Sequence, residues 1–375
     1  LHIPYFRCIR PYNIFKSNIF FMSSDNPQII KLIADSLQLS EKQIRNAIRL
    51  LDEGATIPFI SRYRKEMTDG MDEVQLADTR EQYDKLCELL KRRETVLKTI
   101  EEQDKLTDEL RKRIENCWNA TELEDIYLPF KPKRRTRAEI AREKGLEPLA
   151  KMIMKQNSGD AGRMAQQFTG ENVETTADAL AGARDIIAEW VNESENARNA
   201  VRRNFAYDAV ISSKIIKGKE EEAQKYRDYF EMSEKLSRCS SHRLLAMRRG
   251  EAEGFLRVSI NPDDDRCMER LERIFVRADN EAADQVAEAV KDAYKRLLKP
   301  AGENEFAAES KAKADTEAMR VFAENLRQLL LAPPLGQERT LGVDPGYRTG
   351  CKIVCLDAQG NLLHNETIYP HAPQN

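Results

Sequence analysis

Apolar residues recur every three or four positions along the N-terminal third of the chain, which is the period of an amphipathic α-helix. Ile29 and Ile33 lie on one such stripe, and Ser40 precedes a second stripe that ends at Gly54. A much longer helix is predicted over residues 72–103, where one seam carries Tyr83, Leu86, Leu90, Leu97 and Ile100. The pattern predicts packed helices.

The helical pattern continues beyond this seam. Thr107 is placed to cap the next helix, and the TELE string that begins at Thr121 matches a capping box. Further helices are predicted across 195–217 and 282–298, and another from about Glu303. The alternating string FLRVSI interrupts them and predicts a short strand that pairs only locally.

The last stretch of the chain changes to a β pattern. Residues 339–375 follow the order strand, glycine turn, strand, glycine turn and strand. The first strand, over Leu341 to Val343, is predicted to be buried and ends at Asp344. Because an RNase H-like nuclease holds one ligand of its two-metal site at such a strand end, Asp344 is a candidate catalytic acid.

A two-metal site needs further carboxylates from later strands. The nearby acids, Asp357 and Glu366, are predicted on the outer hairpin, so we expect no complete catalytic site, no bound metal and no catalysis by this chain. A phosphate hairpin of the actin-like ATPase kind is the rival interpretation. It is disfavoured by Pro345 and by the bulky Tyr347 and Arg348 in the turn.

The densest positive charge lies in residues 131–144, which we call the basic arm. They hold seven basic residues against two acidic ones, a local net charge of +5 in a chain whose formal net charge is −3. Two prolines favour an extended start, and Thr136 is placed to cap a helix that ends at a glycine. Residues 121–194 are therefore predicted to form a basic arm with a helix-turn-helix-like insertion. Its candidate nucleic-acid ligands are Lys131, Lys133, Arg134, Arg135 and Arg137.

The basic arm and two other charged stretches each allow two interpretations. The basic arm itself can be a solvated loop followed by an ordinary capped helix. His242 stands beside the candidate phosphate ligands Arg243, Arg248 and Arg249, although a histidine without partner ligands is more often structural. The string ATIPFISRYRKEMTDG places three basic residues beside Phe59 and Tyr63, which either meet phosphate or brace a turn.

Composition narrows the class of protein. A chain of 375 residues normally holds two or three domains, and no run of 18 apolar residues suggests a membrane span. Seven cysteines without a CxxC pair are typical of reduced thiols in the cytoplasm. The motifs of common NTPases, dinucleotide enzymes, zinc proteases and serine hydrolases do not occur, and no cofactor is expected. Met22 looks like the natural start of the protein. Residues 1–24 are expected to be a poorly ordered extension.

Four strings resemble the bacterial Tex family of transcription accessory proteins: LLDEGATIPFISRYRKEMTDGMDEVQL, LEDIYLPFKPKRRTRAEIAREKGLEPLA, YRDYFEMSEKLSRCSSHRLLAMRRGEAEGFL and DPGYRTGCK. The resemblance implies a mainly α fold. Residues 25–120 and 195–333 would form the helical Tex-type N-terminal region. Residues 339–375 would begin a truncated RNase H-like (YqgF, resolvase-like) α/β domain.

The same resemblance implies nucleic-acid binding in transcription, to RNA or DNA, with transcription machinery or the ribosome as further partners. Two alternatives remain open. One is a metal-dependent nuclease or junction resolvase that uses Asp344 with acids this chain lacks. The other is a protein-docking scaffold in which the basic arm is incidental.

Overall fold

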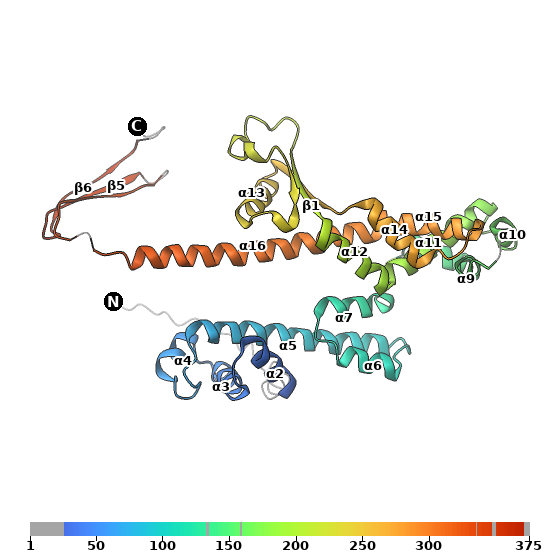
Figure 1. Ribbon diagram of the computed structural model, residues 1–375, viewed down its shortest axis with the longest axis horizontal. Helices are drawn as coiled ribbons and strands as arrows, with labels where there is room; N and C mark the ends of the chain where they lie inside the picture. The colour runs from blue at the N-terminus through green and yellow to red at the C-terminus, as the bar shows by residue number, and fades with distance from the viewer. Residues whose placement is uncertain (1–25, 133–134, 158–159, 335, 347–349, 371–375) are drawn as a thin grey trace, which may run out of the picture. The chain divides into compact units, whose positions relative to one another are not determined.

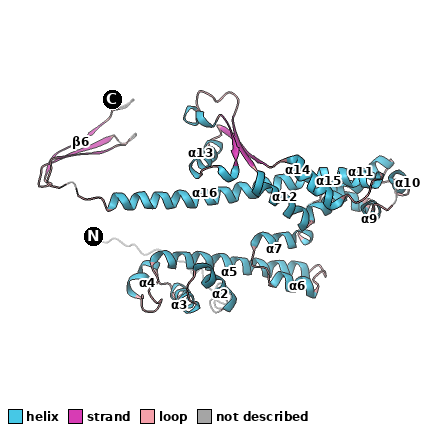
Figure 2. Ribbon diagram, viewed as in Figure 1, coloured by secondary structure: helices cyan, strands magenta, loops and turns pink. Residues whose placement is uncertain are grey.

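The computed structural model divides into two compact units, and Figure 1 shows its helices and strands. It describes residues 26–132, 135–157, 160–334, 336–346 and 350–370. The expected extension over residues 1–24 and the candidates Lys133 and Arg134 lie outside these ranges. Unit 1 combines Leu1–Asn204 with Asp264–Ala301, and unit 2 combines Phe205–Asp263 with Gly302–Asn375. Helices dominate, and the strands form two three-stranded sheets (Figure 2), which confirms the predicted mainly α class.

The first part of unit 1 is a set of capped amphipathic helices. They are α2 (Pro27–Leu37), α3 (Glu41–Asp52), α4 (Ile57–Tyr63), α5 (Glu73–Glu101), α6 (Asp108–Glu115) and α7 (Ala120–Tyr127). The predicted caps are confirmed at Ser40 and Thr107, whose hydroxyls each accept a backbone N–H at 3.2 Å. The capping box at Thr121 is wrong, because the Asn119 side chain already accepts the N–H of Thr121 and starts α7 earlier.

Apolar side chains of these helices fill two clusters. Ile29, Ile33, Ile44 and Ile48, from the two predicted stripes, are all 0% exposed in the first cluster. The second cluster lies around Val96, Ile100, Ile114 and Leu123, where the later turns of α5 meet α6 and α7. Burial of each such side chain contributes about 1.5–3 kcal/mol, so the periodic positions account for the packing.

The second part of unit 1 surrounds α11. Its elements are η1 (Leu128–Phe130), α8 (Arg137–Glu143), α9 (Glu147–Lys155), α10 (Ala161–Gln166), α11 (Thr176–Glu193), α12 (Glu195–Asp208), α14 (Asp264–Phe275), α15 (Glu281–Ala293) and the π-helical η4 (Tyr294–Leu298). α8 approaches α11 closely at Gly182, where a Cβ would lie 2.4 Å from Leu146 Cδ1 and 3.3 Å from Ala141 Cβ. This small residue lets α8, and Arg137 with it, lie against α11.

Unit 2 begins with a sheet that the sequence pattern only partly revealed. Its strands β1 (Val210–Ile215), β2 (Glu231–Lys235) and β3 (Leu256–Asn261) pair antiparallel in the order β2-β1-β3. The predicted helix over 195–217 is wrong beyond Asp208, because the chain enters β1 there. The FLRVSI strand is confirmed as β3, but its partner is the distant β1, with Leu256 opposite Ile215.

The remaining elements of unit 2 are helical before the last sheet. They are η2 (Gln224–Tyr229), η3 (Leu236–Arg238), α13 (Ser241–Ala252) and α16 (Lys299–Leu330). The final strands β4 (Thr340–Asp344), β5 (Cys351–Leu356) and β6 (Leu362–Ile368) form an antiparallel meander, as predicted. Burial of the first strand was predicted wrongly: Leu341 is 63% and Val343 56% exposed, because no described helix covers them.

Candidate nucleic-acid interface

Thr136 and Glu189 fix the start of α8 and therefore the end of the basic arm's extended part. The Thr136 hydroxyl accepts the Glu139 backbone N–H at 3.1 Å, which confirms the predicted cap, and donates to the Glu189 carboxylate at 3.1 Å. Glu189 comes from α11, is only 7% exposed, and pairs with Arg142 at 2.7 Å. Because both partners are largely buried, Arg142 holds the helices together and is unsuited to bind a ligand.

The other described cations of the basic arm face solvent. Lys131 follows η1 and is exposed. Arg135 is exposed and pairs with Glu143 at 2.9 Å, a surface ion pair that a phosphate can compete with. Arg137 occupies the first position of α8 and is also exposed. These three side chains keep their guanidinium or ammonium groups accessible to an anion.

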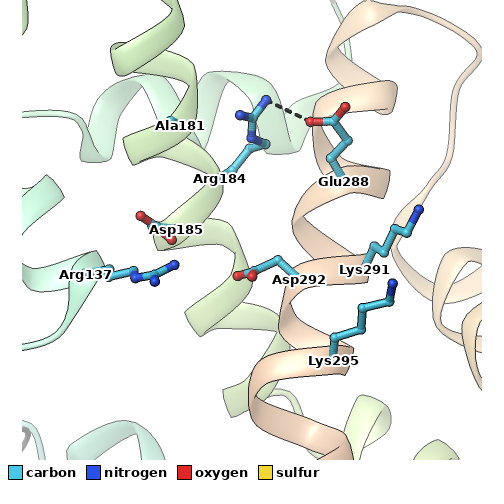
Figure 3. A pocket seen from close by; sticks show the side chains of 8 residues that line it. All are labelled: Arg137, Ala181, Arg184, Asp185, Glu288, Lys291, Asp292 and Lys295. Carbon is cyan, nitrogen blue, oxygen red and sulfur yellow. Dashed lines mark ion pairs between the residues drawn. The ribbon is translucent and has the colours of Figure 1, made fainter.

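Arg137 reaches a pocket between three helices of unit 1 (Figure 3). The pocket has a volume of about 530 Å³, and α8, α11 and α15 each contribute to its lining. Charged side chains make up nearly all of this lining, which consists of Arg137, Ala181, Arg184, Asp185, Glu288, Lys291, Asp292 and Lys295. A pocket of this composition suits a charged ligand and not an apolar one.

The carboxylates of the pocket are engaged by two arginines. Arg184 pairs with Glu288 at 2.8 Å, the contact drawn in Figure 3. Arg296 lies 2.5 Å from Asp292 and 3.6 Å from Asp185. Burial raises the pKa of Asp185, whereas the neighbouring Arg296 and Arg137 oppose that rise. The negative charge of the pocket is thus largely compensated within the protein.

Three cations of the pocket are left over. Across the described ranges, no ion pair within 4.0 Å is formed by Arg137, Lys291 or Lys295. Lys291 and Lys295 are four residues apart on consecutive turns, and both are exposed. Because none of these three cations is held in a close ion pair with a described carboxylate, their charged groups stay accessible to an anionic ligand.

The cluster near His242 divides into braces and one accessible cation. Arg243 pairs with Glu234 at 3.1 Å and donates to the Ser240 hydroxyl at 3.0 Å. Arg248 pairs with Glu251 at 2.8 Å, with only 15% of its side chain exposed. Arg249 is exposed and forms no ion pair with a described residue. Of the three predicted ligands, only Arg249 therefore has a free guanidinium group.

Asp344 ends β4 as the sequence predicts, but its surroundings do not form a metal site. Its carboxylate is 77% exposed and lies 3.9 Å from the Lys352 ammonium. Asp357 accepts hydrogen bonds from Asn361, which lower its pKa, and Glu366 lies 3.4 Å from His364. Within the described residues, no group of three or more His, Cys, Asp or Glu side chains is arranged to hold a metal.

Comparison with known proteins connects these features to one family. A "Tex-like protein N-terminal domain" pattern matches residues 27–101, and a "Tex central region-like" pattern matches 156–322. A "Tex protein YqgF-like domain" pattern matches 338–375, where β4 to β6 lie. The chain belongs to the Tex family. Its final sheet accordingly belongs to a YqgF, RNase H-like domain.

Individual Tex-family relatives align with nearly the whole chain. "Protein YhgF" of Escherichia coli is 42% identical over 93% of this chain and 47% of its own length. "Transcriptional accessory protein Tex" of Neisseria gonorrhoeae is 41% identical over 92% of this chain and 47% of its own. A human "S1 RNA-binding domain-containing protein 1" is 28% identical over 93% of this chain and 36% of its own length. The chain thus spans about half the length, or less, of these relatives.

Two parts of the site could not be found by reading the Tex-like strings. Lys291 lies on α15 and Lys295 on η4, which continues from it, outside every stretch with concentrated basic charge, and only their four-residue spacing marked a shared helix face. The helix-turn-helix assignment stays a prediction, although α8, a turn at Gly145 with φ +78° and α9 follow the predicted order.

None of the described helices is long and apolar enough to cross a membrane.

Proposed function

We propose that this Tex-family chain is part of a nucleic-acid-binding transcription accessory protein, and that it contacts the phosphate backbone through unit 1. The observation that carries the proposal is that Arg137 of the basic arm lines the pocket together with Lys291 and Lys295, all three exposed and without a close ion pair to a described residue. The printed names of the relatives support the class, since one is a transcriptional accessory protein and another an S1 RNA-binding protein.

Phosphate contact explains why the cations are arranged as they are. Lys131 and Arg135 lie on the segment that leads into α8, and Arg137 belongs both to that segment and to the pocket. The phosphate backbone of a nucleic acid that lies along the basic arm up to Arg137 would therefore reach Lys291 and Lys295 next. Such contacts carry no base information, so binding through them is expected to be independent of sequence.

The experiment that tests this proposal is the salt dependence of binding. In the triple variant Arg137→Ala, Lys291→Ala, Lys295→Ala, the log–log slope of affinity against salt should fall by roughly 3 on duplex DNA and about 2 on single strands. Fluorescence anisotropy of labelled oligonucleotides, titrated with the 375-residue chain at several salt concentrations, measures the slope.

A matched control removes the same charge elsewhere in unit 1. Lys85, Lys98 and Lys151 are 69%, 78% and 63% exposed, and each pairs with a glutamate one turn away. Their triple alanine variant should keep the wild-type slope. If both variants lower the slope equally, net charge and not the pocket governs binding, and the proposal for this site is wrong.

We also propose that the chain itself does not cut nucleic acid. Asp344 is one exposed carboxylate, whereas a two-metal mechanism needs several acids that hold two ions about 4 Å apart. Incubation with labelled DNA and RNA in Mg²⁺ or Mn²⁺ should leave both intact. Metal-dependent cleavage that disappears in Asp344→Asn would support the nuclease alternative instead.

A further inference from the structure

α4 displays two aromatic rings to solvent on one helical face. Phe59 is 41% exposed and Tyr63 is 66% exposed, and their ring centroids lie 5.5 Å apart at an interplanar angle of 42°. Large aromatic side chains normally contribute to a core, and neighbouring Ile60 does so with 0% exposure. The outward pair is therefore not required for the packing of α4.

The segment that carries these rings is firmly attached to unit 1. The Ser61 hydroxyl hydrogen-bonds to the Glu73 carboxylate and to the Pro58 carbonyl, both at 3.1 Å. In the turn that follows, the Asn46 side chain donates to the Met67 carbonyl at 2.8 Å. A platform that is held in place in this way loses little conformational freedom when a ligand stacks on it.

Cations lie directly beside the rings. The Arg64 guanidinium carbon lies 5.6 Å from the centroid of Phe59, and neither Arg64 nor Lys65 has an ion pair with a described residue. Arg62 lies 3.7 Å from Glu73, a carboxylate that Ser61 also engages. Positive charge next to an aromatic surface is the combination that binds unpaired bases together with their phosphates.

We propose that α4 and the turn after it bind single-stranded nucleic acid, with unpaired bases stacked on Phe59 and Tyr63 and phosphates near Arg64 and Lys65. An apolar peptide fits less well, because the exposed cations around the rings would have to be desolvated without a partner. RNA and DNA share this chemistry, since every base has a stacking face. Duplexes do not bind here, because their bases are already stacked and paired.

The test separates stacking from general hydrophobicity. In Phe59→Leu/Tyr63→Leu the patch stays apolar but loses its planar rings, whereas Phe59→Trp/Tyr63→Trp keeps them. Labelled oligo(A) of about 12 nucleotides, as RNA and as DNA, and the matching duplex are titrated with each full chain. The leucine variant should bind both single strands about tenfold or more weakly, while the tryptophan variant binds them at least as well as the wild type.

A control and the salt dependence make the outcomes distinct. Tyr207→Leu changes another exposed ring, 70% accessible with Lys235 5.7 Å from its centroid, and should leave binding unchanged. Stacking releases no counterions, so the leucine variant should keep the wild-type salt slope, unlike the pocket variant described above. Equal affinity of the leucine variant and the wild type, or an equal loss on the duplex, would overturn the α4 site without affecting the pocket proposal.

Discussion

Single buried carboxylates hold the helices of unit 1 in register. Asp125, on α7, is 4% exposed and accepts hydrogen bonds from two arginines of α12. Arg198 contacts it at 2.7 Å and Arg202 at 3.0 Å, with a second, shorter contact from Arg202. A buried ion pair of this kind is costly to break because the remaining charges stay desolvated.

Asp125→Asn should therefore destabilise unit 1 by about 3 kcal/mol or more, since it removes the buried negative charge to which the guanidinium groups of Arg198 and Arg202 bond. The two tryptophans of the chain, Trp118 and Trp190, both belong to unit 1. Urea unfolding followed by tryptophan fluorescence consequently reports on this unit and measures the change.

The neighbouring residue supplies a matched control. Glu124 of α7 pairs with Arg92 of α5, but the two side chains are 43% and 39% exposed. Glu124→Gln should cost less than about 1 kcal/mol, because solvent screens this pair. Equal losses in the two variants would show that burial does not govern the strength of these ion pairs.

Cys239 gives a prediction about reactivity. Burial, with Glu234 as a further contribution, raises the pKa of its thiol to about 12. Because the thiolate is the nucleophile, alkylation by iodoacetamide at pH 8 should be roughly a thousandfold slower than in the urea-unfolded chain. Peptide mapping by mass spectrometry after timed labelling measures this rate. Rapid labelling of the folded chain at pH 8 would contradict the raised pKa.

At this scale the sequence revealed side chains that act on their own helix and not those that act across helices. Ser40, Thr107 and Thr136 were recognised as caps because each bonds a backbone N–H three residues away. The roles of Asp125 and Glu189 depend on arginines that the fold brings to them from other helices. Local spacing contains no record of such contacts.

Helices and strands were predicted well where a single period of apolar residues runs through the whole element. They were predicted poorly where the element depends on pairing partners that are distant in the sequence. α5 begins after Asp72 as predicted, since eight turns of one helical period leave little ambiguity. Of the predicted seam, Tyr83 and Ile100 are buried, whereas Leu86, Leu90 and Leu97 are only partly buried. β1 was predicted as part of a helix because the strand is only six residues long and half of its residues are polar. Its strand character comes from β2 and β3, which follow much later in the chain.

The two sheets should differ in how well they protect their backbone. β1 and β3 bury Ile211, Leu256 and Ile260 to 1% exposure or less, whereas every residue of β6 is exposed. Amides of β4 to β6 should therefore exchange with D₂O within the earliest time points, while those of β1 stay protected. Mass spectrometry of peptic fragments compares them, and equal protection of the two sheets would contradict this expectation.

At the scale of the whole molecule, the pocket is a product of chain topology. Arg137 and Lys291 both line the pocket, yet in the sequence Arg137 precedes the first sheet of unit 2 and Lys291 follows it. Sequence reading identified the basic arm because its charges are contiguous. It could not identify Lys291 and Lys295 as part of the same site, because only the packing of α15 and η4 against α11 joins them to it.

This topology predicts that the first sheet of unit 2 can be removed without unfolding unit 1. Its entry and exit are adjacent, since Val210 and Asn261 are cross-strand partners of β1 and β3. Replacement of residues 211–260 by a short Gly/Ser turn should leave the free energy of unfolding of unit 1, measured by tryptophan fluorescence in urea, within about 0.5 kcal/mol of that in the full chain. A chain of the same design cut within α15 should lose that transition.

The discontinuity of unit 1 also sets an order of events during synthesis. The ribosome makes α11 long before α15, so α11 can pack against α8, α9 and α10 at once, whereas its contacts with α15 form only later. Meanwhile the whole of β1 to β3 is made and can pair within itself. The basic arm is thus present on a nascent chain whose pocket does not yet exist, and the anion binding proposed for the pocket requires that Lys295 has been synthesised.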